Sequence, residues 1–380
     1  MSSVKWLNKL LFLEAFLGIY RNYCTHKRIV KYLILFQIFI QSSLLGIVVI
    51  IRLSSIWHSD IATKNAFSFL SVVVGLVTIA TTVYSVYTSE TFMTYYHNIY
   101  RISQYFKQDK NMFNTIKRVY GFCIFFTIFL VVYTLSRSIE DFIITLTEES
   151  NILLWVIAMT SEAITKTSLI FQQLMLYVGI MILVVLTKCL ASLVSMIRNG
   201  LEGNEDSLEA CDVTGQQIQD WVDVYRDLTD SCEKMTLCFG RPFTFSLILS
   251  MFQYVLISYY VFDLTMLDRG QQKLPTEECV TIIVILFVCV FVMTTPLFAG
   301  QLVSNEGINL RRELAGLYNV LIVDSEDAEA KLVKDFIRVI KKNPLQMKLL
   351  NKSAGMYMLP VILSIAVNYL IVMLQFNHII

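Results

Sequence analysis

The sequence predicts an all-α membrane protein with seven transmembrane helices, and three observations lead to this fold class. The chain has 380 residues, of which 56% are apolar, and its mean hydropathy is +0.60. Only 16% of its residues are charged, against about 25% in soluble proteins. Charge-free runs of about 20 residues, the length that spans a bilayer as a helix, recur along the chain. This composition disfavours a soluble enzyme, and a net charge of +1 gives no reason to expect a nucleic-acid partner.

The seven predicted spans follow one another in chain order, each entered or left through a charged residue. They cover residues 32–51, 65–89, 119–136, 167–187, 242–262, 279–305 and 353–380. None of them contains Asp, Glu, Lys or Arg. This absence argues against a proton-coupled transporter and an intramembrane protease, because both need titratable groups within the membrane. We expect no enzyme activity, cofactor or metal.

The helix of the fourth span can begin at either of two places, near residue 151 or near residue 167. Residues 151–161 form another apolar stretch that is too short to span a bilayer and too close to the fourth span for an easy turn. A continuous helix over 151–198 would be about 70 Å long and would project beyond the membrane. Glu162 and Lys166 would then lie one above the other, either as a solvated surface pair or in an outward vestibule with Trp155, Met159 and Thr165.

The basic residues predict the orientation of the chain. With a cytoplasmic N-terminus, 25 of the 31 Lys and Arg residues lie in cytoplasmic segments. The outer side would hold only six, which are Arg52, Lys64, Arg137, Lys166, Arg269 and Lys273. The positive-inside rule therefore predicts a cytoplasmic N-terminus and an extracellular C-terminus. A G-protein-coupled receptor has the opposite orientation.

Two cytoplasmic stretches carry apolar stripes at helical spacing. The first stripe comprises Ile218, Trp221, Val222, Tyr225, Leu228, Cys232 and Met235. The second comprises Leu332, Val333, Phe336, Ile337 and Ile340, and it precedes Asn343-Pro344, which should end the helix. The stripes either pack against each other within one chain or form a collar that also joins subunits.

The predicted spans and these stripes suggest three regions. Residues 1–305 hold helices one to six as the ligand-binding bundle, with a cytoplasmic extension over 188–241. Residues 306–352 form cytoplasmic anchor helices, and 353–380 form the last membrane helix.

The last predicted helix contains one unusual residue, Gln375, which is an amide deep in an apolar run. Burying an amide costs free energy unless it is hydrogen-bonded or wetted. Gln375 therefore either bonds a neighbouring helix or faces a pore that is repeated around an oligomer.

The end of the chain resembles the insect gustatory receptor family. Tyr369, the five apolar residues 370–374, Gln375 and Phe376 match the family's Tyr, five apolar residues, Gln-Phe, and Asn368 stands where the family has Thr. Residues 343–345 and 354–357 loosely resemble an upstream segment of the family.

The resemblance implies a ligand-gated, non-selective cation channel made of four identical subunits, with the seventh helices around a central pore. Tyr369, Val372, Met373, Gln375 and Phe376 would line that pore, with the gate at Gln375 and Phe376. A ring of Phe side chains closes a pore by dewetting, and rotation of the helix would replace Phe with Gln.

The resemblance also implies a tastant pocket within each subunit, open to the outer side. Its candidate residues here are Phe129, Tyr133, Trp155, Met159, Glu162, Lys166, Tyr254, Tyr259, Tyr260 and Phe287. Aromatic side chains stack on flat ligands, yet they are equally common as packing and interfacial residues of membrane helices. We expect a small-molecule tastant, bitter or plant-derived, with a sugar-gated receptor or an odorant-receptor subunit that needs a co-receptor as alternatives.

The remaining expected partners are permeant cations, the lipid bilayer and identical or other receptor subunits. The expected location is the plasma membrane of a gustatory neuron dendrite.

Overall fold

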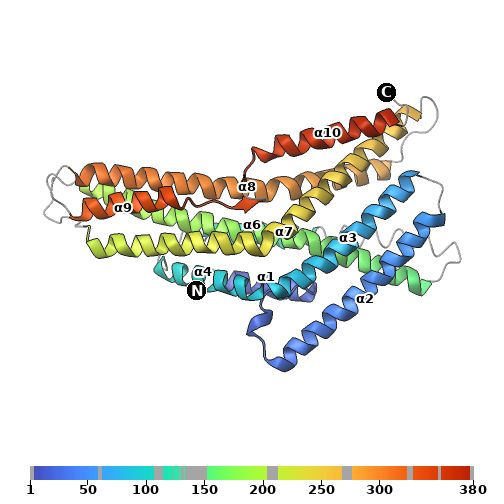
Figure 1. The fold of residues 1–380 in the computed structure, drawn as a ribbon, viewed down its shortest axis with the longest axis horizontal. Coiled ribbons are helices and arrows are strands. Elements are labelled where there is room, and N and C mark those ends of the chain that lie inside the picture. The colour runs from blue at the N-terminus through green and yellow to red at the C-terminus, as the bar shows by residue number, and fades with distance from the viewer. Residues whose placement is uncertain are drawn as a thin grey trace.

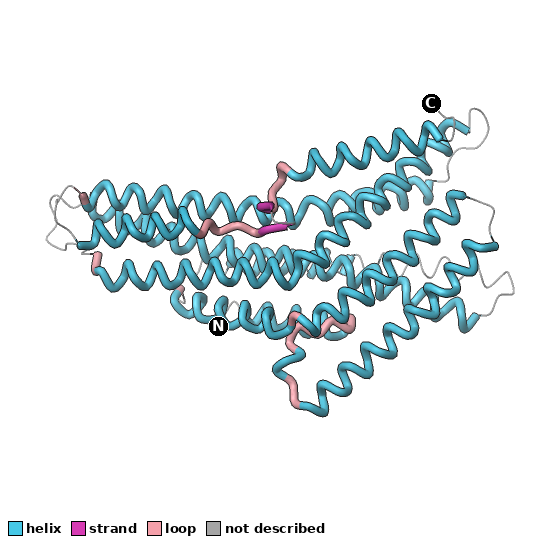
Figure 2. Tube along the Cα trace, viewed as in Figure 1, coloured by secondary structure: helices cyan, strands magenta, loops and turns pink. Residues whose placement is uncertain are grey.

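The computed structural model describes residues 4–58, 62–106, 114–122, 124–126, 128–129, 132, 152–202, 213–267, 276–322, 328–349 and 352–376. These residues form an elongated, largely helical molecule with one short two-stranded sheet (Figures 1 and 2). The elements are α1 (Val4–Phe16), η1 (Tyr23–Thr25), α2 (Arg28–His58), α3 (Ala62–Tyr87), α4 (Ser89–Tyr105), α6 (Ile152–Glu202), α7 (Gly215–Leu267), α8 (Thr276–Leu321), α9 (Ala328–Lys342), β1 (Lys348–Leu349), β2 (Lys352–Ser353) and α10 (Met358–Phe376). The described residues of 114–132 are also helical.

Three long helices, α6, α7 and α8, run along the long axis of the molecule (Figure 1). They contain 51, 53 and 46 residues, which corresponds to about 70–80 Å each. The continuous form of the fourth predicted helix is therefore the one that the structure adopts. The helix α6 contains no proline, whereas α7 contains Pro242 and α8 contains Pro296. Figure 1 shows α7 changing direction near its middle, as expected where proline removes a helix hydrogen bond.

Six helical segments of the described residues are long and apolar enough to cross a membrane. They are Arg28–Ser54, Ser68–Tyr87, Ala163–Glu202, Gly215–Phe262, Ile282–Leu321 and Met358–Gln375. Each contains or overlaps one of the predicted spans. The remaining prediction, 119–136, lies partly outside the described residues. Large apolar side chains such as Ile29, Phe36 and Phe39 are exposed along α2, which suits a surface that faces lipid.

Many of the helix ends gather at two opposite ends of the molecule (Figure 1). The end of α2, the starts of α3, α6 and α8, and the ends of α7 and α10 lie at the right of the view. The end of α6, the start of α7, the end of α8 and the start of α9 lie at the left. The helix ends that the charge distribution assigns to the outer side therefore lie together, apart from those assigned to the cytoplasm.

The two predicted apolar stripes pack on each other within one chain. The ring of Tyr225 on α7 lies 5.7 Å from the ring of Phe336 on α9, and both side chains are buried. The Tyr225 hydroxyl donates a hydrogen bond of 2.8 Å to the carbonyl oxygen of Asn343. The helix α9 ends at Lys342, directly before Asn343-Pro344, as the sequence predicts. Packing within one chain thus covers the buried residues of both stripes.

A tight turn and a buried ion pair hold the N-terminal helix α1 in the fold. Gly18, at φ 84°, takes the left-handed conformation that ends α1, and the amide of Ile19 donates to the carbonyl oxygen of Glu14 at 2.9 Å. The Nε atom of Arg21 contacts both carboxylate oxygens of Glu14 at 3.0 and 3.1 Å. The Arg21 guanidinium also lies 3.7 Å from the ring centre of Phe239 on α7. This short segment therefore attaches α1 to the middle of α7.

A compact link connects α9 to the last helix. Strand β1 pairs antiparallel with β2, and Figure 2 shows the pair close to the start of α10. The amide of Ala354 donates to the carbonyl oxygen of Met347 at 2.7 Å. The last helix begins at Met358 and not at 353, because Ser353 pairs in β2 and a turn follows it. The helix α8 likewise continues past 305 to Leu321, so that the first two predicted regions share one helix.

Candidate functional site

The helix α10 lies at the outside of the molecule, with α7 and α8 on one side of it (Figure 1). Pro360 lies in its first turn, where a missing amide hydrogen is tolerated. Ile362, Ala366 and Leu374 are buried on the side that faces the rest of the chain. At 19 residues, or about 28 Å, α10 matches the thickness of the hydrocarbon core.

Most of the predicted pore residues lie on the uncovered side of α10. Tyr369, Val372 and Gln375 are exposed, and they follow one another at intervals of three residues. Met373 is half-buried, so it is turned further toward the chain than the other three. Phe376 is the last residue of the helix, and its side chain lies outside the described part. Within this chain, the ring of Tyr369 contacts Phe252 of α7 at 6.4 Å between centres.

Several of the predicted pocket residues fall outside what the structure describes. Tyr133 is not among the described residues. Trp155, Met159, Glu162 and Lys166 belong to the first turns of α6, but their side chains are not described.

The remaining pocket candidates differ in exposure. Phe129 and Phe287 are exposed, Tyr254 and Tyr260 are half-buried, and Tyr259 is buried. The exposed fractions place Tyr259 in the packed interior and Phe129 and Phe287 at the surface of the chain.

One of these candidates, Phe287, belongs to an aromatic cluster that joins α8 to the helical residues of 114–132. Its ring stacks on Phe291 at 6.4 Å, and Phe291 lies 4.1 Å from Phe126 and 6.1 Å from Phe122. Sequence reasoning missed three of these four rings. The available signal was the spacing, because both pairs are separated by four residues and so share a helix face.

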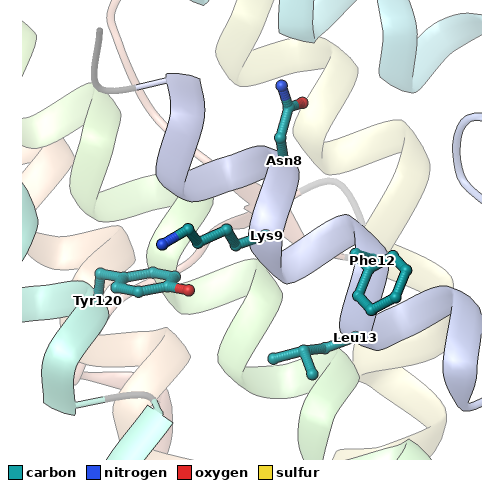
Figure 3. Close-up of a pocket in the computed structure, with 5 residues that line it drawn as sticks. All are labelled: Asn8, Lys9, Phe12, Leu13 and Tyr120. Atoms are coloured by element: carbon teal, nitrogen blue, oxygen red, sulfur yellow. The ribbon is translucent and has the colours of Figure 1, made fainter. Parts of the chain in front are cut away.

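Two hollows among the described residues are lined by none of the predicted pocket residues. The larger, of about 410 Å³, lies between α1 and Tyr120, and Figure 3 shows Lys9 reaching toward the Tyr120 ring. Asn8, Phe12 and Leu13 complete its lining. The smaller, of about 80 Å³, is lined by residues of α8 and α9 and by Pro344 and Leu345.

The titratable groups of the described residues do not form a catalytic or metal centre. No group of three His, Cys, Asp or Glu side chains among them could hold a metal ion. The most deeply buried charge outside the membrane-crossing helices is that of Glu14. Burial raises the pKa of this carboxyl, and the Arg21 guanidinium opposes that rise. The pair serves to attach α1.

Comparison with solved structures shows which fold this is. The chain is similar to the insect olfactory receptor OR5 from Machilis hrabei in complex with eugenol, with a TM-score of 0.72 and 14% sequence identity, over 98% of each chain. It is also similar to a second structure of the same receptor, with a TM-score of 0.64 and 14% identity over 98% of each chain. No curated protein sequence matches the chain. The arrangement of α1 to α10 is thus the olfactory receptor fold.

The sequence matches a family model over nearly its whole length. The model describes the 7tm chemosensory receptor, and the match covers residues 15–379, from α1 to the end of the chain. This match includes the long helices, the link and α10. The chain therefore belongs to the 7tm chemosensory receptor family, which is a family of receptors and not of enzymes.

Proposed function

We propose that this protein is a gustatory receptor that acts as a ligand-gated, non-selective cation channel in the plasma membrane of a sensory neuron. Four copies would surround one central pore, with α10 of each copy facing the axis. One observation carries the proposal. The helix α10 is long and apolar enough to span a bilayer, and the described residues cover it on one side only, which leaves Tyr369, Val372 and Gln375 exposed. An amide on an uncovered membrane face is stabilised by water or by a partner, and a pore formed by copies of the chain supplies both.

The ligand is proposed to be a small molecule, bitter or plant-derived, bound within each subunit. The related receptor OR5 was solved in complex with eugenol, so the fold admits a small organic ligand. Aromatic side chains from α8 and from residues 114–132 supply stacking surfaces in the membrane-crossing part. A panel that contains sugars, bitter compounds and odorants separates the ligand classes.

The experiment is to express the chain alone in cells and to record currents while the panel is applied. We expect fast cation currents that persist when G-protein signalling is blocked. A chain that reaches the surface and stays silent with every compound would refute the homomeric channel. Currents that arise only with a co-expressed co-receptor would instead assign an odorant-receptor subunit.

Two substitutions test the place of the gate. We expect Gln375→Ala and Phe376→Ala to change ion selectivity or basal opening, because both lie at the end of α10. Ala366→Ser is a matched control on the buried side of the same helix, where it should leave the permeability ratios unchanged. Unaltered permeation in both gate variants would remove these residues from the pore.

The orientation is tested separately with epitope tags. Because basic residues concentrate on the α9 side of the chain, we expect a C-terminal tag to stain in intact cells and an N-terminal tag only after permeabilisation. The reverse pattern would overturn the proposed topology.

A further inference from the structure

A regular line of exposed side chains follows the uncovered side of α10. Its members are Val361, Ser364, Asn368, Ile371 and Gln375, and all five are exposed. They are separated by three, four, three and four residues. This alternation keeps a straight line on a helix, because its mean of 3.5 residues is close to one helical turn. Helices that present such a line pack around a common axis.

Three of the five members are polar, although α10 is otherwise strongly apolar. Ser364, Asn368 and Gln375 provide one hydroxyl and two amides within about 40° of one another around the helix, at 100° per residue. The other polar side chain of the helix, Tyr369, lies off the line and contacts Phe252. In the part of the chain that the structure describes, none of the three polar members has a hydrogen-bond partner.

The cost of placing these groups in lipid decides what they face. An amide or hydroxyl that is moved from water into hydrocarbon without a hydrogen-bond partner is strongly disfavoured. Many exposed positions of the other candidate spans carry apolar residues, as Phe36 and Phe39 do on α2. Polar groups on a straight line along a spanning helix instead match the lining of a water-filled path.

We propose that Ser364 and Asn368 line the ion path together with Gln375 and set its selectivity. This inference rests on the proposed function and extends it from the gate to the rest of the helix. In an assembly around one axis, the three side chains form rings separated by about 6 Å and about 10 Å along the pore. Rings of neutral oxygen atoms attract hydrated cations without a fixed charge, which suits a channel that discriminates little between cations.

The first test measures exposure to water without needing a ligand. Single-cysteine variants of the full chain are made in a background whose reactive native cysteines are replaced by serine. They are purified, placed in lipid nanodiscs and treated with a positively charged methanethiosulfonate, and the mass increase is followed over time. We expect S364C, N368C and Q375C to react at least about tenfold faster than F36C, because the reactive thiolate is disfavoured in hydrocarbon.

A neighbouring position provides the matched control. Val367 is exposed at almost the same depth as Asn368, but it lies about 100° away around the helix. We expect V367C to react slowly, as F36C does. Equal rates at V367C and N368C, or slow reaction at both S364C and N368C, would overturn the proposal. The second result is the one expected if these side chains hydrogen-bond between helices.

The second test measures selectivity and separates this inference from the proposed function. A carboxylate ring at Asn368 should raise the permeability of Ca²⁺ relative to Na⁺, by about twofold or more for N368D, whereas V367D should not. A channel that conducts but keeps its permeability ratio in N368D and S364D contradicts the inference and leaves the channel intact. Fast labelling in a protein that no panel compound opens contradicts the proposed function and leaves the water-facing line intact.

Discussion

The buried ion pair between Glu14 and Arg21 predicts that the fold depends on one charged side chain near the N-terminus. Both side chains are almost completely buried, with 0% and 1% of their surfaces exposed. Replacing Arg21 with Met keeps much of the volume and removes the charge. The Glu14 carboxylate would then lie among apolar groups without its partner.

The expected cost follows from this burial. Removing one partner of a buried ion pair destabilises a protein by about 3–5 kcal/mol, because the remaining charge has lost its hydration and has no partner of opposite charge. An unfolding entropy of about 2.1 cal/mol/K per residue gives about 0.8 kcal/mol/K for a chain of this length. We therefore expect Arg21→Met to lower the unfolding temperature by about 4–6 °C.

The assay is thermal unfolding of the purified protein in detergent, followed by the loss of the folded peak in size-exclusion chromatography. The matched control is Arg101→Met. Arg101 pairs with Asp227 at the same nitrogen-to-oxygen distance of 3.0 Å, but 72% of its side chain is exposed. Exposed pairs contribute about 0–1 kcal/mol, so this variant should unfold within about 1 °C of the native chain.

Two results would refute the reasoning. Equal shifts in the Arg21 and Arg101 variants would show that burial does not decide the cost. A double variant, Glu14→Leu with Arg21→Met, should recover most of the lost stability because it leaves no buried charge. If the double variant is as unstable as Arg21→Met alone, the loss comes from packing on Phe239 and not from the orphaned carboxylate.

Three further predictions concern the link, the stripes and the acid dependence of the fold. Gly300→Val should lower the unfolding temperature by bringing a side chain within about 3 Å of the backbone of Ala354, whereas Gly46→Ala, which meets no atom within 4 Å, should have little effect. Tyr225→Phe should cost about 1 kcal/mol through the loss of its hydrogen bond to the end of α9, measured by the same unfolding assay. Because burial raises the pKa of Glu14 in the folded state, stability should fall as pH rises from the ordinary value of 4.5 through the raised one. Glu14→Gln should flatten this part of the pH profile, and a profile that keeps its slope would assign the titration to another group.

The membrane-crossing part of the fold could be predicted because hydrophobicity is a property of single segments. Six of the seven predicted spans overlap apolar helices of the described residues. The end of α9 could be predicted for a similar reason, because Pro344 acts on the backbone next to it. The sequence also allowed, without deciding it, that the fourth span continues into a single long helix.

Other features depend on residues far apart in the chain. One example is the aromatic cluster of Phe122, Phe126, Phe287 and Phe291, which forms only when two helices pack together. Neither segment alone indicates which other segment it packs against. The ion pair of Glu14 and Arg21 could not be predicted either, since a charged residue in an N-terminal amphipathic stretch normally faces water. Burial of both residues depends on α1 packing against α4 and α6.

The two internal prolines, Pro242 of α7 and Pro296 of α8, lie at the same level along the long axis of the molecule. Pro242 lies 27 residues after the start of α7, and Pro296 lies 25 residues before the end of α8. Because these helices run antiparallel, both prolines stand about 40 Å from the end that α9 caps. The helix α6 passes this level without interruption. The helix α6 is thus continuous at the level where α7 and α8 each contain a proline, which is where a helix bends most easily. Because α10 packs on α7, a bend of α7 at Pro242 would tilt α10 relative to the end of the molecule that α9 covers.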